Sequence, residues 1–316
     1  MAEVVKKATR DAYGETLVEL GAEYPDLVVL DSDLAGATKT GMFRKAYPDR
    51  FFNCGIAEQN MMGIAAGLAA CGKKVFASTF AMFAAGRAFE QVRNSIGYPH
   101  LPVKIGATHA GVSVGEDGAT HQCCEDIALM RTIPGMTVIN PADAVEAAKA
   151  VRAAVKLDGP AYLRFGRLAV PVIFGDSYSF EIGKGVQLKE GRDVAIIATG
   201  LLVSEALDAA ELLKNQGISA RVINIATIKP IDREIIIAAA RETGAIVTAE
   251  EHSILGGLGG AVAETVCEAA PVPVLRVGVE DVFGKSGPGA ELLKLFGLTA
   301  ENIAAKAKQA IALKNS

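Results

Sequence analysis

The sequence predicts an α/β protein of two doubly wound domains, each built around a mainly parallel sheet. Short apolar runs typical of buried strands alternate with helical patterns along nearly the whole chain, and each strand–helix–strand step implies a right-handed parallel crossover. Ala, Val, Ile and Gly carry the apolar content, while aromatic residues make up only 6% and Trp is absent. Small apolar side chains suit closely packed layers, and 316 residues suffice for two domains.

The first predicted domain covers residues 1–167. We expect its helices at 11–22, 58–70 and 84–96 and from 141 onward, and its strands at 27–33, 74–78, 101–110, 137–140 and 160–165. Pro25 ends the first helix, and Gly72 caps the second. The first strand ends in Asp31 and Asp33, at the edge where open α/β sheets bind ligands. Both aspartates could also be simple turn formers.

The chain changes character at 168–192, where helical periodicity is lost and short alternating stretches predict a linker with a small β-hairpin. The second domain, 193–316, has expected strands at 194–198, 220–224, 245–249 and 274–279, and helices at 204–216, 233–243, 259–269 and the C-terminus. The run GGLGG at 256–260 fails the dinucleotide-binding pattern G-x-G-x-x-G, because the sixth position counted from Gly257 is Val262 and not Gly. A close backbone approach at a helix start explains it better. We expect Glu250, Glu251 and His252, just before it, to serve an interface.

Composition excludes several classes of protein. The net charge is −4 and no basic cluster occurs, so we expect no nucleic-acid partner. No apolar run reaches the ~18 to 20 residues of a membrane span, and the N-terminus lacks a signal-peptide core. Five cysteines, an odd number without a CxxC motif, predict free thiols in a reducing compartment. We therefore expect a cytoplasmic protein without membrane contact and without a metal site of its own.

Three residues in the first domain suit a flat heteroaromatic ligand. Glu58 begins an apolar helix, and Phe80 and Phe83 follow the next strand, so the fold brings them to one end of the sheet. Two rings can hold the faces of such a ligand while the carboxylate bonds a ring nitrogen. The alternative is a helix-capping glutamate with two core phenylalanines.

Two further features could bind a polar or anionic ligand. The Gly-rich loop 108–126 contains His109, Asp117 and His121, and polar loops of this length are usually functional, although solvated histidines are the simpler interpretation. Arg164 and Arg167 leave the last strand of the domain. Two arginines at a strand end can clamp an anion, or they can be ordinary surface residues.

Three segments in fixed order resemble the pyrimidine-binding domain of transketolases. They are GIAEQNMMGIAAGLA at 55–69, STFAMF at 78–83 and THAGVSVGEDGATHQ at 108–122. The likeness extends more weakly over 8–167, and the second domain resembles the family's C-terminal domain. It implies the thiamine-diphosphate-binding fold. The GEDGATHQ loop is closer to transketolase than to deoxyxylulose phosphate synthase, and unlike the β subunits of 2-oxo acid dehydrogenases.

One part of the family's pattern is missing. Transketolases bind the diphosphate of the cofactor and Mg²⁺ through a GDG motif followed by an Asn pair, and this chain has no GDG. The resemblance therefore implies the C-terminal half of a split transketolase. A separate N-terminal subunit would carry the GDG motif and the Asn pair and would hold the Mg²⁺.

The resemblance also implies a role for each candidate residue. Glu58 would hydrogen-bond N1′ of the aminopyrimidine and activate the cofactor, for which its carboxyl must be poorly solvated. The expected contacts are Phe80 and Phe83 on the pyrimidine, Asp33 near the thiazolium, Asp117 and His121 on the substrate hydroxyl and carbonyl groups, and Arg10, His109 and Arg167 on the sugar phosphate, with Arg164 as a close second. The family's phosphate-binding Ser falls on Ala37, beside Thr38, and a frequent Tyr falls on Gly86.

The implied activity is the transfer of a two-carbon ketol unit between sugar phosphates, in an α₂β₂ heterotetramer. The small-residue helix face at 63–70 would let two pyrimidine domains pair. Two alternatives stay open: the β subunit of a 2-oxo acid dehydrogenase, and a non-catalytic binding or regulatory half.

Overall fold

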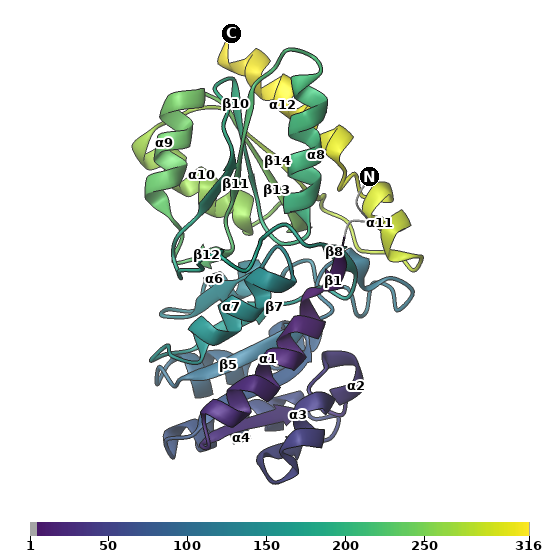
Figure 1. Cartoon of the computed structure of the whole chain (residues 1–316), viewed down its shortest axis with the longest axis vertical. Helices are drawn as coiled ribbons and strands as arrows, with labels where there is room; N and C mark the ends of the chain where they lie inside the picture. Colours follow the sequence, from purple (N-terminus) through teal and green to yellow (C-terminus); the bar gives the residue numbers. More distant parts are fainter. Residues whose placement is uncertain (1–4, 316) are drawn as a thin grey trace.

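A computed structural model describes residues 5–315, so residues 1–4 and 316 of the two expected domains lie outside it. It shows two α/β units stacked along the long axis of the molecule (Figure 1). The strands are β1 (Lys6–Ala8), β2 (Leu27–Asp31), β3 (Phe51–Asn53), β4 (Lys74–Phe80), β5 (Val103–Thr108), β6 (Thr137–Ile139), β7 (Ala161–Arg164), β8 (Ala169–Pro171), β9 (Val186–Lys189), β10 (Val194–Ala198), β11 (Ala220–Asn224), β12 (Thr227–Lys229), β13 (Ile246–Ser253) and β14 (Val274–Val279).

Two mainly parallel sheets confirm the predicted fold class. The first has the order β12-β6-β7-β5-β4-β2-β3 and the second the order β14-β13-β10-β11-β9. Among the described strands of these two sheets, only β12 in the first and β9 in the second run antiparallel to their neighbours. The carboxyl ends of β2 and β4 therefore lie side by side, which brings the segments that follow them together.

Helices cover both faces of each sheet. They are α1 (Thr9–Glu23), α2 (Ala35–Thr38), α3 (Gly41–Ala46), η1 (Pro48–Arg50), α4 (Glu58–Ala70), η2 (Phe83–Arg87), α5 (Phe89–Gln91), η3 (Val92–Gly97), η4 (Val112–Val114), α6 (Asp126–Arg131), α7 (Ala144–Ala154), α8 (Leu202–Lys214), α9 (Arg233–Thr243), α10 (Leu258–Ala269), α11 (Gly289–Leu295) and α12 (Ala300–Lys314).

Strand alternation sorts the core into layers. On β4, Phe76 packs toward α1 and α7, while Val75 and Ala77 pack toward α4 and α6. On β10, Ile196 joins the layer under α8 and α12, and Ile197 joins the layer under α9 and α10. Strands buried on both faces explain why these segments are almost continuously apolar.

The expected hairpin in 168–192 is wrong. Of its two alternating stretches, 178–183 forms no strand, while 185–191 contains β9, which completes the edge of the second sheet beside β11. The strand β8, earlier in the segment, pairs with β1. The strand β12, from the second half of the chain, also crosses over and pairs with β6. The alternating pattern at 185–191 predicted a strand correctly, but the sheet edge that this strand completes is set by the tertiary fold. The boundaries at 167 and 193 stay a prediction.

The helix expected at 84–96 is not a regular α-helix. It consists of η2, α5 and η3, and the Ala88 N–H bonds the Phe83 carbonyl at 3.1 Å, five residues back. A second such bond joins the Tyr98 N–H to the Arg93 carbonyl at 2.8 Å. These wide π turns each fit an extra residue, a feature often found at functional sites.

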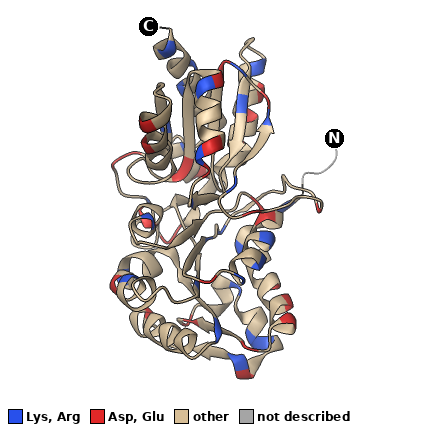
Figure 2. Ribbon diagram, turned by 90° about the vertical axis from the view of Figure 1, so that its left-hand side faces the viewer, with Lys and Arg blue, Asp and Glu red and all other residues tan. Residues whose placement is uncertain are grey.

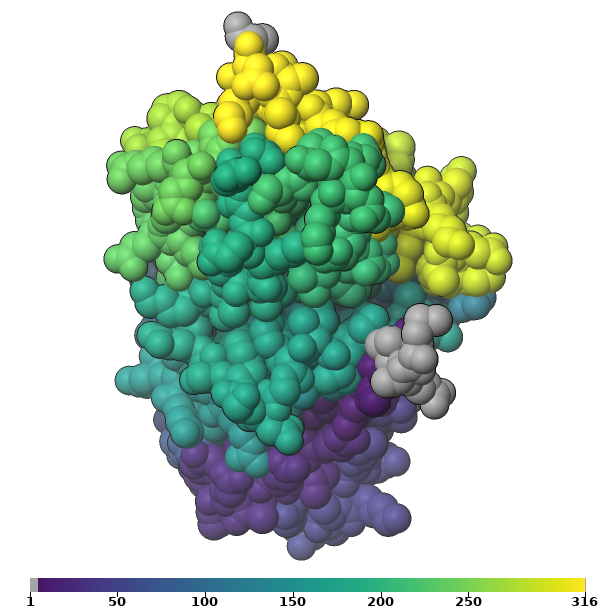
Figure 3. All heavy atoms as spheres, turned by 45° about the horizontal axis from the view of Figure 1, so that its top comes forward, coloured from purple at the N-terminus to yellow at the C-terminus, as the bar shows by residue number. Residues whose placement is uncertain are grey.

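The two units pack directly against each other, and the chain after β14 reaches down the side of the molecule to the first unit (Figure 3). There the Gln122 side-chain amide donates to the Lys285 carbonyl at 2.8 Å. Charged residues of both signs are spread over both units (Figure 2). No helix within residues 5–315 is long and apolar enough to cross a membrane. The five cysteines are free.

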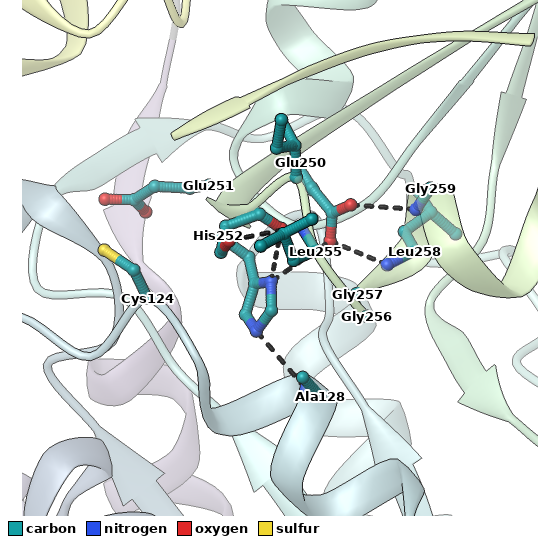
Figure 4. A network of polar contacts seen from close by, with 12 residues as sticks. Cys124, Ala128, Glu250, Glu251, His252, Leu255, Gly256, Gly257, Leu258 and Gly259 are labelled. Atoms are coloured by element: carbon teal, nitrogen blue, oxygen red, sulfur yellow. Dashed lines mark hydrogen bonds and ion pairs between the residues drawn. The ribbon is translucent and has the colours of Figure 1, made fainter. Parts of the chain in front are cut away.

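The predicted interface residues Glu250, Glu251 and His252 are buried between the two units of the same chain (Figure 4). Glu250 accepts hydrogen bonds from the first two N–H groups of α10, at 2.7 and 2.8 Å. His252 accepts the Ala128 N–H at Nε2, which ties β13 to α6. At Gly257 an added Cβ would lie 2.1 Å from the Glu250 carboxylate, so the close backbone approach predicted for GGLGG is confirmed.

Candidate active site

A cavity of about 350 Å³ lies at the carboxyl ends of β2 and β4. It brings together four residues predicted from sequence: Asp33, Glu58, Phe83 and His121. Its other lining residues are Ser32, Leu34, Ile56, Arg87 and Thr120. Thr120 also lines a second cavity of about 600 Å³ between the units, beside Met82 and Phe283. Segments distant in sequence thus converge at one edge of the sheet.

Glu58 is the first residue of α4 and is only 1% exposed. Gly55, with φ of +72°, makes the turn that delivers the chain to this helix start. The carboxylate accepts a hydrogen bond from Arg87 Nη1 at 2.8 Å. Sequence reasoning missed Arg87. The available signal was only its closeness in sequence to Phe83, because the π turn between them departs from a regular helical period.

The two phenylalanines are not equivalent. Phe83 lines the cavity, whereas Phe80 is buried behind it and stacks on His109 with 3.9 Å between ring centroids. The Phe80 and Phe83 rings lie nearly parallel with centroids 5.8 Å apart. For a third ring to fit between them, the two phenylalanine rings would have to be separated by about twice the ~3.5 Å contact distance of carbon atoms, which exceeds the observed separation. The two rings therefore do not hold opposite faces of one ligand in this structure.

A cationic end of the site forms around His109. Arg10 Nη1 donates to the Ala37 carbonyl and to His109 Nε2, both at 3.0 Å, and His109 Nδ1 lies 2.9 Å from Thr108 Oγ1. Burial lowers the pKa of His109 to about 3, and the positive charges of Arg10, Arg167 and Lys39 add to this effect. His109 is thus neutral at physiological pH, with Nε2 as the acceptor and Nδ1–H as the donor.

Arg167 lies at the open side of this cationic end. Its Nη1 donates to the Val114 carbonyl and lies 3.4 Å from a Glu116 oxygen and 3.9 Å from an Asp117 oxygen. Lys39, which sequence reasoning also missed, pairs with Asp11 at 3.1 Å. The half-exposed guanidinium of Arg167 remains available to an anion that displaces these weak surface contacts.

The structure does not bring Arg164 and Thr38 into the cavity. Arg164 is buried, with Nε on Asp126 Oδ2 and Nη2 on the Glu251 carbonyl, each at 2.8 Å. Thr38 is fully buried, and its hydroxyl donates to Asp31 Oδ2 at 2.7 Å. Both side chains hold elements of the fold together. Their positions at strand and loop ends did not reveal the direction in which they point.

The residues present fit the aminopyrimidine half of thiamine diphosphate. Beside the Glu58 carboxylate and the Phe83 ring, Ser32 Oγ is buried without a hydrogen-bond partner among the described residues. An unpaired buried hydroxyl next to a cavity suits a polar ligand. Where the resembling family often has Tyr, at Gly86, the Met82 side chain fills the space. Within residues 5–315, no group of three His, Cys, Asp or Glu side chains is arranged to hold a metal.

The small-residue face at 63–70 divides into two. Ala65, Ala66 and Ala69 point into the core of the first unit. Gly63 and Gly67 point outward, and a Cβ added at either would meet nothing within 4 Å. The outward half of α4 is therefore uncrowded, and self-association of two copies there stays a prediction.

Comparisons with known proteins agree with this geometry. The model of the transketolase pyrimidine-binding domain matches residues 5–172, and that of the transketolase C-terminal domain matches 183–303. A protein of Methanocaldococcus jannaschii named a transketolase C-terminal section is 55% identical over 95% of both chains. A 6-deoxy-6-sulfo-D-fructose transketolase subunit from a Clostridium species is 44% identical over 97% of this chain and 95% of its own. A solved split-gene transketolase, described as an inactive β4 tetramer, superposes with a TM-score of 0.91 and 57% identity over 97% of this chain and 99% of its own.

Proposed function

Since this chain belongs to the transketolase family and corresponds to the C-terminal section of its split members, we propose that it transfers a two-carbon ketol unit between sugar phosphates together with an N-terminal subunit. The observation that carries the proposal is the convergence of Glu58, Phe83 and His121 on one cavity, with the cationic end of Arg10, His109 and Arg167 nearby.

Thiamine diphosphate, when bound, supplies a carbon centre that can accept a ketol unit and release it to a second carbonyl. In this chain, Glu58 holds a proton at N1′ of the aminopyrimidine, and Phe83 packs on the ring. Phe80 supports Phe83 from behind, Ser32 offers a hydroxyl, and Asp33 at the cavity wall would lie near the thiazolium.

The substrate is oriented by two sets of residues. His121 is within van der Waals reach of the Phe83 ring edge, with 5.2 Å between ring centroids, and contacts the substrate's hydroxyl or carbonyl oxygen. Asp117 binds a hydroxyl further along the sugar. Arg10 and Arg167 bind the terminal anion, with neutral His109 as a hydrogen-bond partner and Lys39 as an added positive charge. The second candidate for this terminal anion is a sulfonate, because one relative is a subunit of a 6-deoxy-6-sulfo-D-fructose transketolase. A sulfonate carries one negative charge less than a phosphate dianion.

The N-terminal subunit carries the diphosphate site and the Mg²⁺. It covers the open cavity, which is incomplete on its own because this chain provides no motif for the diphosphate. Self-association through Gly63 and Gly67 of α4 then yields an α₂β₂ heterotetramer. A cytoplasmic location is part of the proposal, and the five free cysteines support it.

Two alternatives make different predictions. The relatives described above are transketolase sections or subunits, which favours ketol transfer over the release of CO₂ by a 2-oxo acid dehydrogenase. A non-catalytic half would show no ketol transfer with any partner, although its site residues would remain in place.

Reconstitution tests the proposal. The chain is combined with the N-terminal subunit, thiamine diphosphate and Mg²⁺, and ketol transfer from a ketose phosphate to an aldose phosphate is measured. We expect Glu58→Gln to lower kcat by at least about 100-fold. Glu90→Gln is the matched control, because Glu90 is exposed and bonds only its helical neighbours Gln91 and Asn94 among the described contacts. No transfer by the wild-type complex, or near-full activity of Glu58→Gln, would refute the proposal.

A further inference from the structure

We propose that Arg87 occupies the aminopyrimidine position in the isolated chain and that cofactor binding requires this side chain to leave it. Arg87 is then a gating residue of the cofactor site. The inference rests on the proposed function, because it takes the cavity beside Glu58 as the place where the aminopyrimidine binds.

The guanidinium makes the two contacts that the aminopyrimidine would need. Its Nη1 donates to Glu58 Oε2 at 2.8 Å, and its carbon lies 4.4 Å from the centroid of the Phe83 ring. A guanidinium is planar, carries N–H donors and stacks on aromatic faces. The aminopyrimidine is likewise planar, bonds the same carboxylate and packs on the same ring. The two groups therefore compete for one position.

Burial of Glu58 explains why the isolated chain fills this position itself. A carboxylate that is 1% exposed is costly without a partner. The only cation paired with Glu58 among the described residues is Arg87. The π turn of η2, closed by the bond from the Ala88 N–H to the Phe83 carbonyl, sets where Arg87 stands relative to Phe83. Local geometry and electrostatics thus both place the guanidinium over the ring.

Exposure shows how the position can be vacated. The Arg87 side chain is 48% exposed, and it lines the open cavity rather than the core. Its polar and ring contacts among residues 5–315 are those with Glu58 and Phe83. Rotation of the side chain into solvent therefore breaks two contacts and opens no core packing, and the cofactor restores a partner to Glu58.

Binding of thiamine diphosphate to the isolated chain tests the inference without any turnover. Isothermal titration calorimetry measures the affinity for thiamine diphosphate of the wild type, of Arg87→Met and of the control Arg93→Met. The control removes an exposed arginine that bonds Asn94 and not Glu58. Because Met cannot hold the carboxylate, we expect Arg87→Met to bind roughly tenfold more tightly or better, and Arg93→Met to match the wild type. Equal or weaker binding by Arg87→Met overturns the inference. So does the finding that neither the wild type nor Arg87→Met binds the cofactor at millimolar concentration.

A crystal structure of the wild-type chain soaked with thiamine diphosphate gives a second readout that does not depend on the stability of a variant. We expect Arg87 to have left Glu58 and the pyrimidine to lie on Phe83. An Arg87–Glu58 pair that persists beside a bound pyrimidine refutes the gate. Ketol transfer by the wild-type complex is measured separately, so the gate can fail while the proposed function stands.

Discussion

Arg164 and Arg167 stand three residues apart, yet Arg164 stabilises the fold and Arg167 is available to bind an anion. Substituting each by Met measures the two roles separately. Arg164 is buried against Asp126 and is only 3% exposed, while the Arg167 side chain is 37% exposed beside the cationic end of the site. Arg164→Met leaves the fully buried Asp126 carboxylate without its positive partner. Arg167→Met removes a half-exposed charge whose nearest acidic oxygens lie 3.4 and 3.9 Å away.

The expected magnitudes differ accordingly. Breaking a buried ion pair costs about 3–5 kcal/mol, which lowers the Tm of a unit of this size by about 6 to 20 °C. Loss of a surface charge changes stability by less than about 0.5 kcal/mol. If Arg167 binds the substrate anion, however, its loss removes a charged hydrogen bond of about 1.5–3 kcal/mol and raises KM by roughly 10- to 150-fold.

Thermal unfolding of the isolated chain and KM of the reconstituted complex measure the two effects. The double variant Asp126→Leu with Arg164→Met should recover part of the lost Tm, because it also removes the buried Asp126 charge that otherwise lacks a partner. The reasoning fails if Arg164→Met keeps the wild-type Tm, or if Arg167→Met keeps the wild-type KM while the wild type turns over.

Three further predictions follow from the structure. Burial raises the pKa of Glu251 to about 7 from 4.5, so the folded chain holds a proton that the unfolded chain releases, and stability falls as pH rises through this window. The free energy of unfolding, measured by urea denaturation, should differ less between pH 5 and pH 8 in Glu251→Gln than in the wild type, by up to about 3 kcal/mol. An unchanged dependence of this free energy on pH would argue against the prediction. Because His109 is already neutral, His109→Gln should leave the shape of the pH profile of KM unchanged between pH 5 and 8, and loss of a step there would contradict the assignment. Gly67→Leu, on the outward face of α4, should shift the isolated chain toward monomer in sedimentation, while Gly175→Leu, also exposed and uncrowded, should not; equal behaviour of the two would place the self-association face elsewhere.

The sequence was most informative where a pattern is local. Helix α4 runs from Glu58 to Ala70 as predicted, because an apolar helical run is bounded on one side by a turn at Gly55 and on the other by Gly72, whose φ is +82°. The position of Glu58 at the ligand-binding edge followed from the helix, turn and strand that lead from it to the phenylalanines. The same reasoning placed Phe83 near it, since parallel strands end at one edge, whereas only the family resemblance linked His121 to this site.

The sequence was least informative about side-chain direction and partners. Arg164 is the last residue of the buried strand β7 and Arg167 follows that strand, but the partner of Arg164, Asp126, comes from α6, whose place depends on the whole fold. Phe80 and Phe83 are close in sequence, and the end of β4 separates them into a buried ring and a cavity-lining ring. The pairing of Arg87 with Glu58 depends on a π turn, and a regular helical period does not predict it.

The central claim is that this chain works as one half of a split ketol transferase, and native mass spectrometry of the chain isolated from its own cell extract tests it most directly. The account predicts a complex with equal numbers of this chain and a second chain of similar mass that carries the GDG motif and the Asn pair. If the chain emerges only with copies of itself under conditions that preserve complexes, the split-enzyme account is contradicted.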